Sequence, residues 1–368
     1  MEQTTNADRE TVLNELTQPV LFAREGELTR CNAAAEALLG ADGARLEDIL
    51  GESLDFYRAY DGKGVMDLTL RFRGKLYDAT VRREDGTDVF LAASAPASER
   101  LSLETLAVAA QTIRGPLTDL FDAASVLFPM LEDQEDPKIQ KQTARLNRGF
   151  YKLLRIAGNL SDLRLYLTGE ARLDDERTDL RAFFGELAER AGGYCAEAGL
   201  RLRCVCPERC FYGSIDRQKV ERAVLNLISN AMKFTPAGGE IVLRVERTEH
   251  SVLVRVTDTG EGIDPLMMAT IFSRYEHREQ LGDPRWGVGL GLPLVRMIAQ
   301  LHGGTVVVRS GPGEGTSVTM SLALRARPAG GALRSPVMGF DYAGGFSHAA
   351  LELSDALPNE AFDTVNLV

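Results

Sequence analysis

Histidine is almost missing from this sequence, and its distribution limits the chemistry. The chain has four histidines, at positions 250, 277, 302 and 348, so residues 1–249 contain none. Any reaction that needs an imidazole in that part of the chain is excluded. Cysteine is scarce as well. Five cysteines cannot pair completely and are too few to staple 368 residues, which predicts reduced thiols.

The cysteines that lie closest together do not predict a zinc site. Cys204, Cys206 and Cys210 have a C-x-C-x3-C spacing that fits no common zinc pattern, and no histidine is nearby. Basic residues are also in deficit, because the net charge is −11. An acidic chain of this kind argues against nucleic acid as a partner, since phosphate binding needs a basic surface.

Long apolar runs are absent too. No stretch of about 18 uninterrupted apolar residues occurs, which predicts no membrane span, and the segment MEQTTNADRE lacks a basic leader with an apolar core. We therefore expect a cytoplasmic protein. With 44% hydrophobic and 26% charged residues the composition is globular. The length predicts two or three domains.

Residues 1–97 are predicted to form a small α+β domain. The segment from Asn32 to Leu50 is rich in Ala and Leu and predicts short helices. It lies among the predicted strands, which are 20–23, 28–31, 65–72, 75–82 and 89–93. The segment QPVLFAREGELTRCNAAAEALLG resembles the opening of a PAS sensor domain. Without a histidine for haem, and without the residues that flank the cysteine of flavin photosensors at Cys31, no chromophore is expected. A dimerising spacer and a small-ligand sensor both remain open.

Residues 98–170 are predicted to form a helical hairpin. Apolar residues follow one another at alternating steps of three and four, first from Leu103 to Leu131 and again from Ile139 to Leu160, with the turn EDQEDP between them. A hairpin with such narrow stripes cannot cover its own seam in water. Pairing with a second copy completes an antiparallel four-helix bundle, so we expect a homodimer.

Residues 171–326 mix helical and strand periods, which predicts helices packed on a mixed sheet. The expected helices are 179–191, 216–234 and 290–301, and the expected strands are 240–247, 251–258, 304–310 and 317–324. Residues 327–368 begin with the Pro/Gly linker RPAGGALRSP and end in an acidic amphipathic piece with no assigned role.

Three polar patterns in residues 171–326 point to a site. Asn226, Asn230 and Lys233 share one face of a predicted helix, where amide oxygens can ligate Mg²⁺ and an ammonium can contact phosphate. Asp258 ends an apolar strand and is followed by glycines, which let backbone approach a flat ligand. The glycine run 287–291 directly precedes a helix, where exposed amides favour an anion. Each pattern alone also fits a solvated helix face or an ordinary turn.

In this order the segments NLISNAMK, DTGEGI, IFSRY, GVGLGL and HGGTVVVRSGPGEGT resemble the nucleotide-binding boxes of the histidine-kinase ATPase domain. That domain belongs to a wider group with gyrase, chaperone and mismatch-repair ATPases. The resemblance implies an α/β sandwich that binds ATP and Mg²⁺. It implies that Asn230 ligates Mg²⁺, that Asn226 and Lys233 support the phosphates, and that Asp258 receives the adenine amino group. The remaining implied contacts are Gly260, Gly262 and Thr316 on the adenine side and Gly287, Gly289 and Gly291 along the triphosphate.

The same resemblance argues against a fast ATPase. Gyrase-like relatives carry a water-activating glutamate one turn before the magnesium asparagine, and here Asn226 takes that place. Without a general base there, rapid hydrolysis is poorly supported. Residues 276–286 would form the mobile lid, in which Arg278 or Arg285 would reach the terminal phosphate.

The phosphoacceptor of histidine kinases is also replaced. Their first bundle helix carries a stretch of the form S-H-E-L-R-T-P-L, whereas this chain reads A-Q-T-I-R-G-P-L from Ala110 to Leu117. Gln111 takes the acceptor position, and an amide nitrogen has no lone pair available to attack phosphorus. Autophosphorylation at this position is therefore chemically excluded. Thr112 and Thr118 remain possible hydroxyl acceptors, but neither has an evident base.

Three functions follow as hypotheses. The first is a cytoplasmic sensor histidine-kinase homologue that binds ATP and Mg²⁺ and acts as a nucleotide-dependent scaffold or regulator for a response regulator or a partner kinase in two-component signalling. The second is an active kinase that phosphorylates a partner in trans, on the histidine of a heterodimer partner or on serine. The third is an ATP-gated binding module without phosphotransfer.

Overall fold

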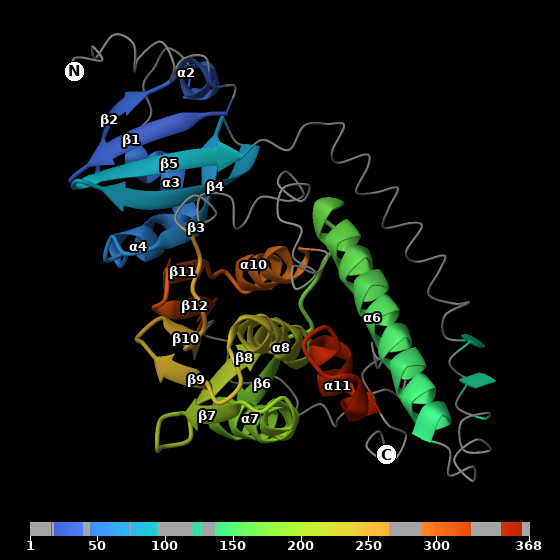
Figure 1. Ribbon diagram of the computed structural model, residues 1–368. Coiled ribbons are helices and arrows are strands. Elements are labelled where there is room, and N and C mark those ends of the chain that lie inside the picture. Colours follow the sequence, from blue (N-terminus) through green and yellow to red (C-terminus); the bar gives the residue numbers. More distant parts are fainter. Residues whose placement is uncertain are drawn as a thin grey trace, which may run out of the picture.

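The computed structural model describes residues 16, 18–39, 45–73, 75–93, 119–120, 123–124, 126, 137–264, 289–324 and 347–362. Figure 1 shows an N-terminal α/β unit, a second sheet covered by helices, and the long helix α6 beside α10 and α11. Residues 347–362 lie against α6 and the second unit and are part of the same fold.

The N-terminal unit is a five-stranded antiparallel sheet in the order β2-β1-β5-β4-β3. Asn32 is fully buried after β2, and its carboxamide oxygen accepts hydrogen bonds from the amides of Val20 (2.9 Å) and Ala35 (3.0 Å). It thereby joins the first strand to the first helix. The strands lie where they were predicted. The elements are β1 (Val20–Arg24), β2 (Glu27–Cys31), α2 (Ala33–Leu39), α3 (Leu46–Leu50), η1 (Gly51–Ser53), α4 (Leu54–Arg58), β3 (Val65–Phe72), β4 (Lys75–Glu84) and β5 (Thr87–Ala93).

The second unit packs helices α7, α8 and α10 on a sheet in the order β11-β12-β10-β9-β7. Alternate residues of β10 are buried, as the period-two pattern predicted. The short strands β6, β7 and β8 were not predicted. The elements are β6 (Glu176–Asp179), α7 (Leu180–Glu197), β7 (Arg201–Val205), β8 (Tyr212–Ile215), α8 (Arg217–Phe234), β9 (Glu240–Arg247), β10 (Ser251–Asp258), α10 (Gly291–Leu301), β11 (Val306–Gly311) and β12 (Gly315–Ala323).

The two sheets join into one ten-stranded sheet. Strand β3 pairs antiparallel with β11, with Met66 opposite Val307 and Val65 opposite Val308. Beside this junction the carboxylate of Asp67 lies 2.7 Å from Nε of Arg296 on α10, and both residues are buried. The N-terminal unit is therefore attached to the second unit by backbone pairing and by a buried ion pair.

Helix α6 (Pro137–Leu167) corresponds to the second helix of the predicted hairpin. One face, with Ala144, Tyr151 and Leu154, is buried against the rest of the molecule. Leu146 and Leu153 lie on the predicted seam and keep 50% and 48% of their surface exposed. Most of the first predicted helix, including Gln111, lies outside the described residues.

The C-terminal segment, residues 347–362, folds onto α6 and α8, which the sequence did not predict. It consists of α11 (His348–Leu353), a turn, and η3 (Asn359–Phe362). Ser347 caps α11 by accepting a hydrogen bond from the amide of Ala350 (3.3 Å). The fully buried side chains of Ala350, Leu353, Leu357 and Phe362 belong to the same core as α8 and its sheet.

Candidate functional site

Helix α8 carries three of the predicted site residues on one face. Asp216 caps the helix by accepting from the amide of Lys219 (3.0 Å). Asn226 is fully buried, Asn230 is partly buried, and the Lys233 side chain keeps 10% of its surface exposed. The spacing of four and then three residues places them on one stripe, as predicted.

The N-terminus of α10 faces the two asparagines. A Cβ atom on Gly291 would lie 3.2 Å from Oδ1 of Asn226 and 3.6 Å from Nδ2 of Asn230, so α10 begins in contact with both amides. Among the described residues, no side chain caps this helix. Its first amide groups are therefore directed to the same place as the asparagines, with the positive end of the helix dipole behind them. Gly289 adopts a φ of +72°, which favours glycine.

Asp258 lies at the end of β10, as predicted, and is 7% exposed. Its Oδ1 accepts hydrogen bonds from the amides of Gly260 (2.9 Å) and Thr316 (3.1 Å). Among the described residues no donor bonds to Oδ2. Burial raises the pKa of the Asp258 carboxyl, although the two amides act in the opposite direction. The second oxygen is thus available to a donor on a ligand.

The backbone beside Asp258 is closely packed, and this packing requires glycine. A Cβ atom on Gly260 would lie 2.4 Å from the carbonyl oxygen of Phe234 at the end of α8. Gly262 has a φ of +73°, and a Cβ atom there would lie 1.9 Å from the carbonyl oxygen of Gly311. The hydroxyl of Thr316 is bonded to that of Ser310 (2.9 Å).

The structure brings the predicted residues into two neighbouring groups. Asn226 and Asn230 meet Gly291 along α8, with Lys233 on the same helix face. Asp258 meets Gly260 and Thr316 at the C-terminal end of the same helix, where the amide of Glu261 bonds to the carbonyl of Phe234 (3.2 Å). Gly287 and the predicted lid, residues 276–286, lie outside the described residues.

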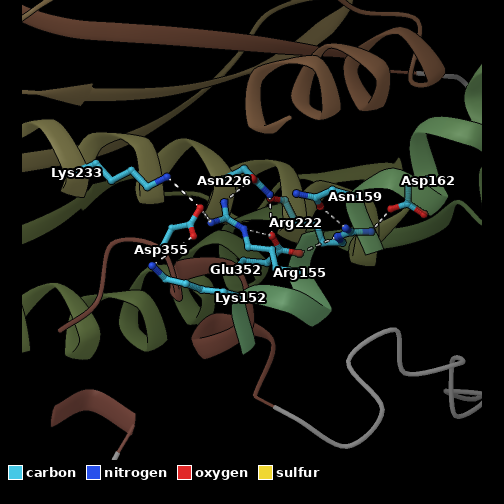
Figure 2. A network of polar contacts seen from close by, with 9 residues as sticks. All are labelled: Lys152, Arg155, Asn159, Asp162, Arg222, Asn226, Lys233, Glu352 and Asp355. Atoms are coloured by element: carbon cyan, nitrogen blue, oxygen red, sulfur yellow. Dashed lines mark hydrogen bonds and ion pairs between the residues drawn. The ribbon is translucent and has the colours of Figure 1, made fainter. Parts of the chain in front are cut away.

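Sequence reasoning missed that the chain's own C-terminal segment reaches the same asparagine. The carboxamide of Asn226 donates to Oε2 of Glu352 (2.8 Å) and to the carbonyl of Arg222 (2.9 Å), while its Oδ1 accepts from Nη2 of Arg155 (2.7 Å). Figure 2 shows these side chains converging from α6, α8 and the C-terminal segment.

Glu352 is fully buried between two guanidinium groups. Its Oε1 lies 2.8 Å from Nε of Arg222, and its Oε2 lies 3.3 Å from Nε of Arg155. Arg222 also bonds to Asn159 (2.7 Å) and to the carboxylate of Asp162, both on α6 (Figure 2). Each buried charge has an oppositely charged partner, which a buried ion needs in order to be tolerated.

Asp355 makes the second contact of the C-terminal segment with the predicted site. Its Oδ2 lies 3.1 Å from Nζ of Lys233 and 2.9 Å from Nη1 of Arg155. Burial acts to raise the pKa of the Asp355 carboxyl, but Lys233 and Arg155 outweigh it and hold the pKa below its ordinary value. Burial lowers the pKa of Lys233, against the opposing effect of Asp355.

The only local signal for this segment was its apolar spacing. Ala349, Ala350, Leu353 and Leu357 recur at helical intervals between acidic residues. That pattern predicts a buried face but does not say what the face packs against. The contact with Asn226 is a property of the tertiary structure alone.

Two negative findings apply to the described residues. Within them, no group of three or more His, Cys, Asp or Glu side chains is arranged to hold a metal ion. Cys204 and Cys206 have their sulfur atoms 3.4 Å apart, and Cys210 is exposed. The helices in the described ranges include none that is both long and apolar enough for a bilayer.

Comparison with known proteins shows which proteins this region is similar to. Residues 215–326 match the family described as histidine kinase-, DNA gyrase B- and HSP90-like ATPase, a range that contains all the predicted nucleotide contacts. The alginate biosynthesis sensor protein KinB of Pseudomonas aeruginosa is 30% identical over 226 residues, which cover 61% of this chain and 38% of KinB. The histidine protein kinase DivJ of Caulobacter vibrioides is 39% identical over 139 residues, covering 38% of this chain and 23% of DivJ.

The chain thus spans well under half the length of these two relatives. Among solved structures, full-length ShkA in complex with AMPPNP has a TM-score of 0.49 and 25% identity, covering 61% of this chain and 47% of ShkA. Residues 215–326 therefore form an ATPase domain of the histidine kinase, gyrase and HSP90-like type, in a chain whose homologues include sensor histidine kinases.

Proposed function

We propose that this protein is a cytoplasmic two-component signalling regulator that binds ATP with Mg²⁺ and does not autophosphorylate at the usual position. The observation that carries the proposal is the arrangement around α8. A buried carboxylate with an available oxygen lies at its C-terminal end, and two amides face the uncapped N-terminus of α10 along its length. In this role it is a nucleotide-dependent scaffold for a response regulator or a partner kinase.

The adenine side of the site is Asp258 with its glycines. Oδ1 of Asp258 is held by two backbone amides, which leaves Oδ2 to accept a hydrogen bond from the adenine amino group. Gly260 keeps side-chain atoms away from this carboxylate, and Gly262 lets the chain pass close to the backbone of Gly311. Thr316 borders it through the amide that bonds to Asp258.

The phosphate side is the α8 stripe with the start of α10. The fit to Mg²⁺ rests on the donor chemistry: Asn230 is half-buried beside Gly291, and a carboxamide oxygen is a hard ligand that suits this cation. Bound Mg²⁺ would neutralise phosphate charge. Asn226 and Lys233 would support the phosphates, and Gly287, Gly289 and Gly291 would border them.

The environment of Asn226 supports binding without rapid hydrolysis. Asn226 is a carboxamide whose oxygen accepts from Arg155, so this position holds no general base. The replacement of the acceptor histidine by Gln111 removes the usual nucleophile. Both features favour a protein that holds ATP over one that consumes it.

The remaining parts of the chain support a dimeric sensor. The five-stranded antiparallel sheet with helices between its second and third strands in sequence is compatible with a PAS-type domain. Leu146 and Leu153, seven residues apart on the exposed side of α6, offer a seam for a second copy. We propose a homodimer joined along this face.

ATP with Mg²⁺ should raise the melting temperature of the purified chain. By mass action the stabilisation is about 2.7 kcal/mol when ATP is present at 100 times its dissociation constant. Asp258→Asn and Asn230→Ala should each remove most of the shift, because they remove the adenine acceptor and the metal ligand. Asp61→Asn changes an exposed carboxylate that pairs with Arg309, and should leave the shift intact. No shift for the wild type at millimolar ATP would refute nucleotide binding.

Incubation with γ-labelled ATP separates the scaffold from a kinase. We expect no label on the chain itself. Acid-stable label on the chain would identify a hydroxyl acceptor such as Thr112 or Thr118 and would contradict the scaffold role. Label that appears only on an added partner kinase or regulator would establish phosphorylation in trans.

A further inference from the structure

The C-terminal segment, residues 347–362, uses the same side chains that the proposed site needs for the triphosphate. Glu352 accepts from Asn226, and Asp355 pairs with Lys233. Asn226 and Lys233 are two of the three α8 residues assigned to phosphate and Mg²⁺. The third, Asn230, lies between them in the sequence of the same helix face.

The hydrogen-bond capacity of Asn226 is already used. A carboxamide has two N–H donors, and here one reaches Glu352 while the nitrogen also donates to the carbonyl of Arg222. A phosphate oxygen could accept from Asn226 only after Glu352 has left. Two carboxylates beside a triphosphate would also repel it in a poorly solvated place.

The side chains that would remain at this place without the segment are mostly basic. In the network of Figure 2, α6 and α8 contribute Lys152, Arg155, Arg222 and Lys233 against the carboxylate of Asp162. Glu352 and Asp355 supply the missing negative charge. Departure of the segment would therefore leave an uncompensated cationic surface at the proposed phosphate side, which an anion can neutralise.

The segment is docked by its apolar side as well as by its charges. Phe362 is fully buried with its ring centroid 5.3 Å from that of Tyr151 on α6, and Arg148 on α6 bonds to Asn359 (3.1 Å). Ala350 is fully buried in α11, which packs against α8. The two carboxylates are thus held in place by packing on both sides of them in the sequence.

We propose that residues 347–362 are an internal competitor of the nucleotide: Glu352 and Asp355 occupy the phosphate-binding groups of α8, and ATP with Mg²⁺ binds only when this segment leaves. The inference rests on the proposed nucleotide site and adds its regulation. Because the competitor is tethered, it lowers the apparent affinity for ATP by the fraction of molecules in which the segment is released. ATP in turn favours the released state, and so carries a signal to the end of the chain.

Titration of full-length protein with ATP and Mg²⁺ by calorimetry tests the competition. Glu352→Gln replaces the docked carboxylate by a neutral amide and so weakens docking of the segment. Ala350→Glu forces the segment away from α8 through bulk and charge. These variants change the net charge in opposite directions, yet both should bind ATP at least about tenfold more tightly than the wild type. Glu249→Gln removes an exposed carboxylate that is 86% accessible, and should leave the affinity unchanged.

The outcomes distinguish the two proposals. Equal, measurable affinity in the wild type, Glu352→Gln and Ala350→Glu would overturn the competition and leave the nucleotide site standing. Tighter binding in Glu249→Gln and Glu352→Gln but not in Ala350→Glu would show a general charge effect and would also overturn it. Absence of binding in every protein, matching an Asp258→Asn control, would refute the nucleotide site and the competition together.

Hydrogen exchange of the wild-type chain gives a second readout that needs no variant. At saturating ATP and Mg²⁺ the amides of α11 should lose protection, while those of α8 and β10 gain it. If α11 stays as protected with ATP as without it, the segment and the nucleotide are bound together and the competition is wrong.

Discussion

A single buried carboxylate, Asp258, sets the chemistry on the adenine side. Burial favours its neutral form and raises its pKa, while two backbone amides on Oδ1 partly restore the charge. For an acid, a raised pKa means that the folded state holds the proton more tightly than the unfolded chain. The ionised form therefore costs stability at neutral pH, and a donor on a ligand offsets part of that cost.

Nucleotide affinity should respond to acid through Asp258. The adenine amino group needs a carboxylate acceptor, so affinity falls as the pH drops through the raised pKa, above the range in which an ordinary Asp titrates. Titrations with ATP across mildly acidic pH measure the loss. Asp258→Asn should bind weakly at every pH and lack this dependence. A wild-type affinity that stays constant until the ordinary Asp range would contradict the assignment.

Residue by residue, the sequence predicts one half of the site and not the other. Asn226, Asn230, Lys233 and Asp258 could be found because the local pattern of a helix stripe and a strand end places each of them. Glu352 and Asp355 could not, because nothing near them in the sequence specifies that they meet Asn226 and Lys233 across more than 100 intervening residues.

Among the described elements, α6 joins α8 to the C-terminal segment. Arg155, near its middle, contacts α8 through Asn226 and the C-terminal segment through Glu352 and Asp355. The heptad pattern predicted the helix and its apolar seam, but it gave no reason for a buried arginine on another face. The polar side chains of α6 are explained only by the element that packs on them.

Removal of Arg155 should destabilise this junction of three elements. Arg155→Met keeps an apolar stem of similar length but leaves Glu352 and Asp355 without one cation, and breaking a buried pair costs about 3 kcal/mol. Arg164→Met is the matched control on the same helix, because Arg164 pairs with the exposed Glu170 and such a pair contributes less than about 1 kcal/mol. Urea unfolding measures both. Equal losses would show that Arg155 has no special role.

Docking of the C-terminal segment should weaken in acid. The pKa of Asp355 is held below its ordinary value, so its pairing with Lys233 contributes stability above the unfolded pKa and loses it as the pH falls through the folded one. This loss lies at lower pH than the titration of Asp258. Hydrogen exchange of α11 against pH measures it, and Asp355→Asn should remove the dependence. Protection that increases in acid would contradict the sign.

At the scale of the whole molecule, the two sheets are continuous through β3 and β11. The sequence predicts both strands, yet strand patterns do not specify which edge meets which, so this pairing was not foreseen. Two residue pairs attach β3 of the N-terminal unit to β11. The ion pair of Asp67 with Arg296 attaches the same unit to α10, whose first residue faces Asn226 and Asn230. A change in the N-terminal unit can therefore reach the proposed nucleotide site through one helix.

Gly64 offers a test of that attachment. It has a φ of +78°, and a Cβ atom there would lie 2.1 Å from the carbonyl oxygen of Val308 on β11, so Gly64→Ala must separate the two strands. Gly86→Ala is the matched control: its φ is +76°, but no atom lies within 4 Å of the new methyl group. Both variants carry the same backbone strain, and only Gly64→Ala adds the clash.

In calorimetry Gly64→Ala should split the melting of the N-terminal and ATPase units into two transitions, while Gly86→Ala should melt in one transition like the wild type, at a modestly lower temperature. If the two variants melt alike, the edge pairing does not couple the units, and α10 receives no signal from β3.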